Sequence, residues 1–123
     1  MLVAVNESER VELAKAYVAL SNSHRLELIF AMFGAQASYH SANVGVFTGK
    51  AAIASMMTEF FARFPDVHWQ ADNYRCTQNG DVQFDFEMNA TDVASGENIQ
   101  RAGVEEIRFA ADGLILRLEV RKQ

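Results

Sequence analysis

One carboxyl group stands out as a candidate for acid–base chemistry. Glu105 lies in the stretch Glu97–Ala111 and shares an alternating face with Ile107 and Phe109. Burial among apolar side chains disfavours the charged form of a carboxyl and raises its pKa. Such a group serves as a general acid, a general base or a neutral hydrogen-bond donor to an oxyanion. The alternative is a structural carboxyl that a buried tyrosine or arginine satisfies.

Two further side chains, Arg101 and His40, have chemistry that suits a ligand site. Arg101 is on the same alternating face as Glu105, roughly 13 Å away along an extended strand. It would bind an acidic or carbonyl-bearing ligand, or it would lie at a rim with its charge in water. His40 would serve as a base near neutral pH, or it would lie at the surface of a polar, turn-rich stretch.

Aromatic and methionine side chains offer the wall of an apolar pocket. They fall on the apolar faces of one predicted helix and of two predicted strands. We predict that four of them contact an apolar ligand: Phe60, Trp69, Phe86 and Met88. The same residues would equally well form a filled core.

The composition argues against several kinds of chemistry. The three histidines lack the spacing of metal ligands, and the single cysteine, Cys76, cannot form a thiolate cluster, so we expect no metal site. No Gly-rich phosphate loop is present, and we expect no cofactor.

Charge and hydropathy limit the partners. The net charge of −5 argues against nucleic acid and against anionic membranes. No apolar run approaches the ~20 residues that span a membrane. A lone cysteine fits a reducing compartment, so we expect a cytoplasmic protein.

The second half of the chain predicts an antiparallel meander. Asn79-Gly80 and Asp112-Gly113 are strong hairpin signals, and Ser95-Gly96 is a weaker one. They separate four runs with the alternation of strands: Val67–Gln78, Asp81–Ala94, Glu97–Ala111 and Leu114–Arg121.

Two-residue loops at these turns would define the register. Glu105 then lies on an apolar face, opposite Phe86 and Val120. The other face is polar, and its apolar area comes from three residues, namely Tyr74, Val104 and Ile115.

Three amphipathic helices precede the meander. Asn6 and Glu9 have the spacing of a capping box before the first helix. A second helix follows from Leu26 and is predicted to end at Gly34, before a short strand around Ala37–Ser41. The third helix ends near Phe64, because proline follows it.

These elements predict one α+β domain over residues 1–123. The apolar face of the sheet needs a cover, and the helices have apolar stripes that would supply it. We therefore expect three N-terminal helices packed on a curved antiparallel β-sheet.

The order of these motifs resembles the nuclear transport factor 2-like superfamily, the cone-shaped fold of ketosteroid isomerases and SnoaL-type polyketide cyclases. The resemblance covers nearly the whole chain and rests on Thr48–Ile53, Phe60–Val67, Ile107–Phe109 and Asp112–Ile115. It implies a pocket between helices and sheet, and commonly a homodimer through the outer sheet face. The superfamily contains enzymes as well as proteins that only bind or scaffold.

The same resemblance assigns roles to individual residues. Glu105 matches the acidic residue that donates to the oxyanion in ketosteroid isomerases, and Tyr17 matches their oxyanion-binding tyrosine. As an alternative, Tyr17 is a core aromatic. The position of the isomerase base falls on His40 or Ser41, and neither is a carboxylate.

Two classes of function follow from this sequence. The first is a domain that binds a small apolar, carbonyl-type ligand and performs isomerase- or cyclase-like acid–base chemistry with Glu105, Tyr17 and His40. The second is a non-catalytic dimeric module that either binds a ligand or has a filled core and only contacts other proteins.

Overall fold

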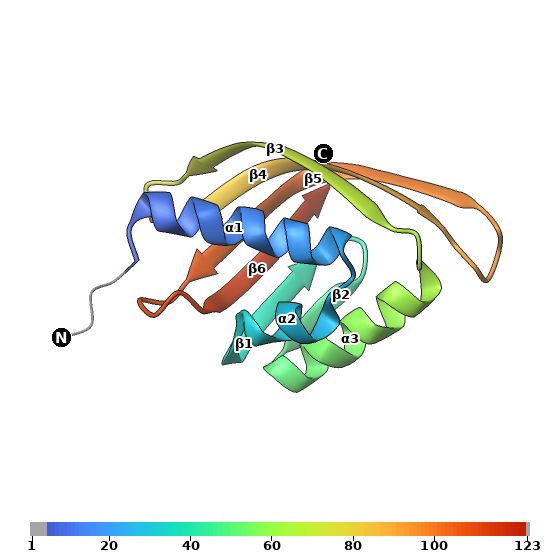
Figure 1. Ribbon diagram of the computed structural model, residues 1–123, viewed down its shortest axis with the longest axis horizontal. Coiled ribbons are helices and arrows are strands. Elements are labelled where there is room, and N and C mark those ends of the chain that lie inside the picture. The colour runs from blue at the N-terminus through green and yellow to red at the C-terminus, as the bar shows by residue number, and fades with distance from the viewer. Residues whose placement is uncertain (1–4, 123) are drawn as a thin grey trace.

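A computed structural model describes residues 5–122, so the ends of the predicted domain, residues 1–4 and 123, lie outside the described part. Three helices and six strands follow one another in the order shown in Figure 1. The helices are α1 (Glu7–Asn22), α2 (Leu26–Ala31) and α3 (Lys50–Arg63). The strands are β1 (Phe33–Ser41), β2 (Gly45–Thr48), β3 (His68–Cys76), β4 (Val82–Thr91), β5 (Asn98–Phe109) and β6 (Ile115–Lys122).

The strands form one curved sheet in the order β2-β1-β6-β5-β4-β3, and the helices cover one of its faces (Figure 1). This confirms the α+β class and the predicted meander, which is β3 to β6. The structure adds one parallel contact, because β1 lies along β6 and brings β2 with it to the far edge. The core fills the space between the inner sheet face and the three helices.

Local sequence signals position the first and third helices. The Asn6 side chain accepts from the Glu9 backbone N–H at 2.8 Å, and the Glu9 carboxylate accepts from the Asn6 N–H at 3.1 Å, which completes the predicted capping box. Helix α3 ends at Arg63, two residues before Pro65, as expected from the proline.

The second helix is shorter than predicted. It ends at Ala31 with Met32 as its C-cap, so Gly34 does not terminate a helix but lies inside β1. Backbone pairing explains this difference, because Phe33 pairs with Ile115 of β6 and the Ile115 N–H donates to the Met32 carbonyl. A long-range strand contact thus overrides the local helical pattern.

The hairpin loops are longer than the predicted two residues. The loop after β3 has three residues between Thr77 and Asp81, with Gly80 at φ +83°, and the loop after β5 has the same form with Gly113 at φ +89°. A left-handed glycine after a type I turn forms such three-residue loops. The loop between β4 and β5 has four residues between Asp92 and Glu97, where the Asp92 N–H donates to the Glu97 carbonyl, so Glu105 pairs with Phe84 rather than Phe86.

The predicted faces nevertheless survive this shift. The β4–β5 pairs are displaced by two residues, which returns every side chain to its expected side. Between β5 and β6 the predicted register is correct, and Glu105 faces Val120.

Two bulges turn predicted outward residues toward the helices. A bulge between Asp72 and Arg75, with Asn73 at φ +55°, brings the Tyr74 ring to 4.9 Å from Phe84. A second bulge buries Ile115 completely. Of the three apolar residues expected on the outer face, only Val104 remains there. Association of two copies through this face stays a prediction.

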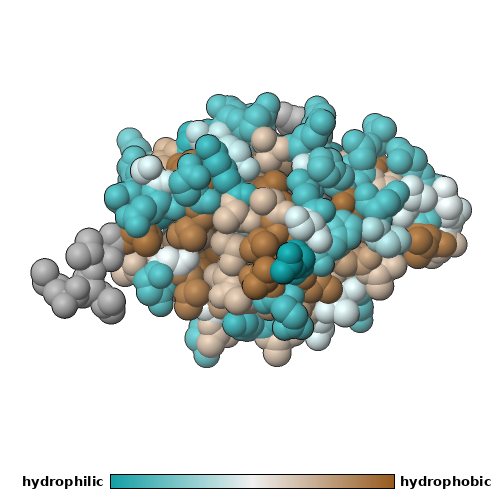
Figure 2. Space-filling view, viewed as in Figure 1, coloured by the Kyte–Doolittle hydropathy of each residue, from teal (hydrophilic) through white to brown (hydrophobic). Residues whose placement is uncertain are grey.

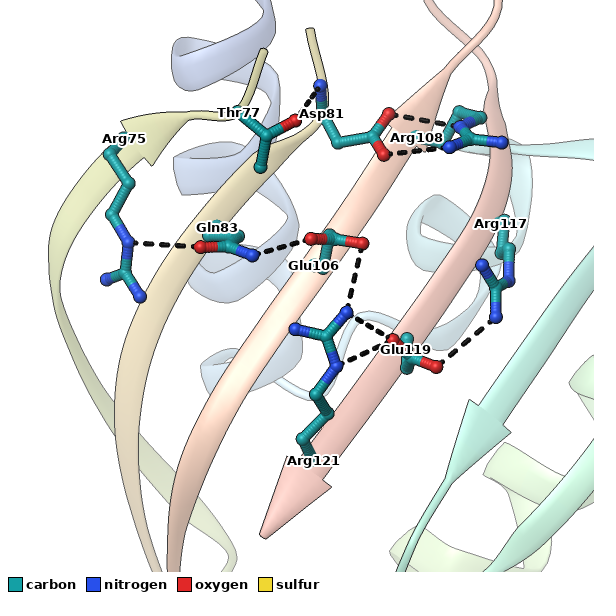
Figure 3. Close-up of polar contacts among 9 residues, drawn as sticks. All are labelled: Arg75, Thr77, Asp81, Gln83, Glu106, Arg108, Arg117, Glu119 and Arg121. Atoms are coloured by element: carbon teal, nitrogen blue, oxygen red, sulfur yellow. Dashed lines mark hydrogen bonds and ion pairs between the residues drawn. The ribbon is translucent and has the colours of Figure 1, made fainter. Parts of the chain in front are cut away.

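Charged side chains on the outer face neutralise one another within the sheet (Figure 3). Glu106 lies directly opposite Glu119, an arrangement that alone would be destabilising. Arg121 bridges both carboxylates, at 3.2 Å from Glu106 and through its Nε at 2.7 Å from Glu119. Gln83 adds a hydrogen bond to Glu106 at 2.6 Å. The outer face thus provides partners for its own charges.

The helix-covered side has a different surface (Figure 2). Hydrophobic residues gather over its middle, where α1 and α2 lie on the sheet, and hydrophilic residues surround most of this area. Leu28 is 43% exposed there, and an open groove lined by Leu13, Met32 and Leu114 contributes further apolar area.

Gly103 allows close packing of β6 against β5, so we expect Gly103→Ala to destabilise the fold. An added Cβ would collide with the Arg121 backbone carbonyl and would lie 3.2 Å from the Phe86 ring. Overpacking of this kind costs about 1–3 kcal/mol in the free energy of unfolding, which urea denaturation measures. Gly34→Ala is the matched control, because its nearest backbone atom lies at 3.5 Å. Equal effects of the two substitutions would contradict the prediction.

Candidate active site

The candidate site is a narrow cavity of about 50 Å³ on the inner face of the sheet. Helices α1 and α3 and strands β1, β3, β4, β5 and β6 all contribute side chains to it. Its polar lining consists of Tyr17, Ser21, Tyr39, Ser41, Asn43, Arg101 and Glu105. Its apolar lining consists of Val18, Val44, Phe60, Trp69, Phe86, Met88 and Val120.

Glu105 is the one carboxyl group in this lining. It is only 6% exposed, in the middle of β5 between Phe84 and Val120. Burial raises the pKa of Glu105 to about 8, and no hydrogen bond or cation of the described chain lowers it again. The carboxyl is therefore mostly neutral at pH 7, and it can both give and accept a proton near that pH.

Two tyrosine hydroxyls lie in the same cavity. Burial, then the neighbouring Tyr39 and Glu105, raise the pKa of Tyr17 well above its ordinary value. The pKa of Tyr39 is also raised, mainly by burial and then by Glu105. Both hydroxyls thus stay protonated and act as hydrogen-bond donors.

The two side chains influence each other, since Tyr39 raises the pKa of Tyr17. Both hydroxyl protons can be offered to a ligand in the cavity. Tyr17 is held in place by an edge-on contact with Phe33, at 6.0 Å between ring centroids.

Arg101 lies at the mouth of the cavity. It is on β5 opposite Met88, and its guanidinium lies 5.8 Å from the centre of the Phe64 ring. Burial, and then the nearby Arg63, lower its pKa. Arg101 also lines an adjoining open groove of about 430 Å³, so it stands between the two spaces.

The predicted aromatic wall is in place around the cavity. Phe60 and Trp69 stack with ring centroids 6.0 Å apart, and Phe86 and Met88 are buried beside them. Asn22 fixes this wall to the end of α1. Its side-chain amide donates to the backbone carbonyl of Trp69 at 2.9 Å and accepts from the backbone N–H of Trp69 at 2.8 Å.

The structure does not bring His40 to the cavity, which corrects the expectation that it shares a ligand with Glu105. His40 pairs with Val46 and with Glu119, whose side chain belongs to the outer face. Its neighbour Ser41 alternates to the inner side and lines the cavity. Successive residues of a strand point to opposite faces, so only one of His40 and Ser41 can face the cavity.

Tyr39 is the site residue that the sequence did not reveal. It lies in the predicted strand Ala37–Ser41, where buried Ala37 marks the inner face. Serine, tyrosine and histidine occupy both faces of this strand, so its alternation is not visible as a hydrophobic pattern.

Within residues 5–122, no cluster of three or more histidine, cysteine or acidic side chains is arranged to hold a metal ion. None of the helices in this range has the length and hydropathy needed to cross a membrane.

Residues 14–118 match the family model of the SnoaL-like domain. The match spans most of the chain, so this protein belongs to the SnoaL-like family of the nuclear transport factor 2-like superfamily. Among curated proteins, none matches the sequence.

Several solved structures share the fold. The epoxide hydrolase/cyclase-like enzyme SalBIII of salinomycin pyran ring formation has a TM-score of 0.86 at 18% identity, over 95% of this chain and 92% of that one. AclR, a putative hydroxylase from Streptomyces galilaeus, has a TM-score of 0.79 at 21% identity, over 96% and 91%. A putative isomerase from Bacillus subtilis has a TM-score of 0.82 at 16% identity, over 94% and 88%. At these identities the likeness concerns the fold alone.

The buried carboxyl predicts a pH-dependent stability. The pKa of Glu105 is about 8 in the folded state against an ordinary value of 4.5, so between these values the folded chain holds a proton that the unfolded chain has lost. The free energy of unfolding should therefore fall as pH rises from about 5 to 8, on the order of 1 kcal/mol per pH unit from this group, and level off above.

Urea denaturation across this pH range tests the prediction. Glu105→Gln keeps a neutral side chain of similar shape and should lack the decline. Parallel pH profiles for the wild type and this variant would show that Glu105 is not buried as a neutral acid.

Proposed function

We propose that the cavity binds a small apolar carbonyl compound and that Glu105 moves a proton to and from the carbon next to the carbonyl. The observation that carries this proposal is a buried carboxyl without a protein partner, in one narrow cavity with two protonated tyrosine hydroxyls. An unpartnered buried carboxyl is costly, and a ligand would provide the missing contact.

The proton transfer uses the ionised fraction of Glu105, which is the minor form at pH 7 and grows toward its pKa of about 8, together with the protonated tyrosine hydroxyls. The carboxylate form of Glu105 takes a proton from the carbon, and the C–H electron pair moves into the carbonyl to give an enolate. The Tyr39 hydroxyl donates to the enolate oxygen, and the Tyr17 hydroxyl is a second donor in the same cavity. Glu105 then returns the proton to the same carbon or to another one, which completes an exchange or an isomerisation.

The small size of the cavity limits its ligands. Sites for drug-sized molecules enclose roughly 300–1,000 Å³, far more than the 50 Å³ here. A second void of about 40 Å³ shares Phe60 and Val44 with the cavity, and both residues also line the outer groove. Rotation of Phe60 would join these spaces, so a slender ligand that continues into the groove fits best.

A non-catalytic ligand-binding module is the second candidate function. The cavity lining contains no second carboxylate and no histidine to assist Glu105, which favours binding without turnover. The two functions differ in one measurable quantity, namely the rate at which the ligand exchanges its acidic hydrogens.

Exchange of α-hydrogens of a small apolar ketone in D₂O, followed by NMR, tests the proposed chemistry. We expect the protein to accelerate exchange, and Glu105→Gln to lower the rate by about 10²–10⁴-fold because the base is lost. Tyr39→Phe should lower it by about 10²-fold because an oxyanion donor is lost. Glu106→Gln is the control, since this neighbour faces the outer side of the sheet and should leave exchange unchanged.

The outcome separates the two candidates. Ketone binding without accelerated exchange would establish the binding module and reject the proton transfer. If the protein neither binds a ketone nor accelerates its exchange, both functions are rejected. The remaining hypothesis is then a module that only contacts other proteins.

A further inference from the structure

Arg101 is a half-buried cation without an anion to neutralise it. Among residues 5–122, no carboxylate lies within ion-pair distance of its guanidinium, and no hydrogen bond to that group is formed. The N–H donors of a guanidinium form a planar fork that matches a carboxylate. The Phe64 ring lies beside the group, with the guanidinium carbon 5.8 Å from the ring centre.

Two other charges of the groove, Arg63 and Asp92, bind each other, and the third, the exposed Glu59, forms no ion pair with Arg101. Arg63 lies in the same groove and bonds to the nearly buried Asp92 through two nitrogens, at 3.1 and 2.7 Å. This pair lowers the pKa of Asp92 to about 2, so the carboxylate stays charged and bound to Arg63. Asp92 therefore does not compensate Arg101, and the repulsion from Arg63 adds to the local need for an anion.

Arg101 and Glu105 form the two ends of one continuous space. They point to the same side of β5 with Gly103 between them, and both line the cavity. Four residues of β5 span roughly 13 Å between Cα atoms. The deep end thus presents a neutral acid and tyrosine hydroxyls, and the mouth presents a positive charge, with apolar side chains between the two.

From this arrangement we infer that the ligand is an anion: an apolar carbonyl compound whose carboxylate binds Arg101 at the mouth while its carbonyl reaches Glu105 and Tyr39. The inference rests on the proposed function, because it assigns the opposite end of the same ligand. Separation of the two ends also keeps the ligand carboxylate away from Glu105, which would repel it in the charged form.

Straight-chain ketocarboxylates of increasing length, each compared with its methyl ester, test the inference. Trp69 is the single tryptophan of the chain and lines the cavity, so its fluorescence reports binding, and calorimetry confirms the affinities. We expect a ketocarboxylate of matching length to bind at least about tenfold more tightly than its ester, because a charge-assisted, two-pronged contact forms. Affinity should pass through a maximum with chain length.

Variants at Arg101 show whether this residue causes the preference. Arg101→Gln should remove the difference between acid and ester, and Arg101→Lys should keep part of it. Arg117→Gln changes the net charge equally, but Arg117 pairs with Glu119 on the outer face and should leave the preference unchanged.

Three results would overturn the inference: equal affinity for acid and ester, a preference that survives Arg101→Gln, or no binding of any member of the series. Its failure differs from failure of the proposed chemistry. A carboxylate preference that depends on Arg101, without accelerated exchange, would support the anionic ligand and reject proton transfer by Glu105. Exchange that depends on Glu105, without a carboxylate preference, would support proton transfer by Glu105 and reject the anionic ligand.

Discussion

The burial of one unpaired carboxyl on the inner face of β5 is the constraint on which the rest of this site depends. Glu105 is surrounded by Phe84, Val120 and the helices, and this environment makes the neutral acid the stable form. An apolar residue at this position would pack without such a cost. The carboxyl is therefore best explained by an occupant of the cavity, and the neighbouring hydroxyls of Tyr17 and Tyr39 have the chemistry to act on the same occupant.

The two faces of the sheet differ in whether their charged groups have partners. On the outer face, arginines and carboxylates of neighbouring strands bind one another, and Arg121 alone bridges two glutamates. On the inner face, Glu105 and Arg101 have no such partners in the described chain. Because the same strand supplies residues to both faces, the contrast is one of position rather than composition, and it supports the proposed binding site on the inner face.

The fold by itself permits many activities. Structures that share it include a cyclase-like enzyme, a putative hydroxylase and a putative isomerase, at identities of 16–21%. In this chain the lining of the cavity contains one carboxyl, two tyrosines and one cation, and no histidine. The proposed activity depends on these few side chains and on the position of Phe60, which lines both small voids.

The sequence by itself determined the elements and the inward side of the meander. The Asn6 capping box, Pro65 and the turn glycines act over a few residues, so they are readable locally. Glu105 and Arg101 were placed correctly although the loops were longer than predicted, because a two-residue shift preserves the faces. Only the tertiary structure decided that Tyr39 and Ser41 face inward and His40 outward, since β1 takes its orientation from β6, far along the chain. The bulges at Asn73 and directly after Ile115, and the volume of the cavity, likewise depend on long-range packing.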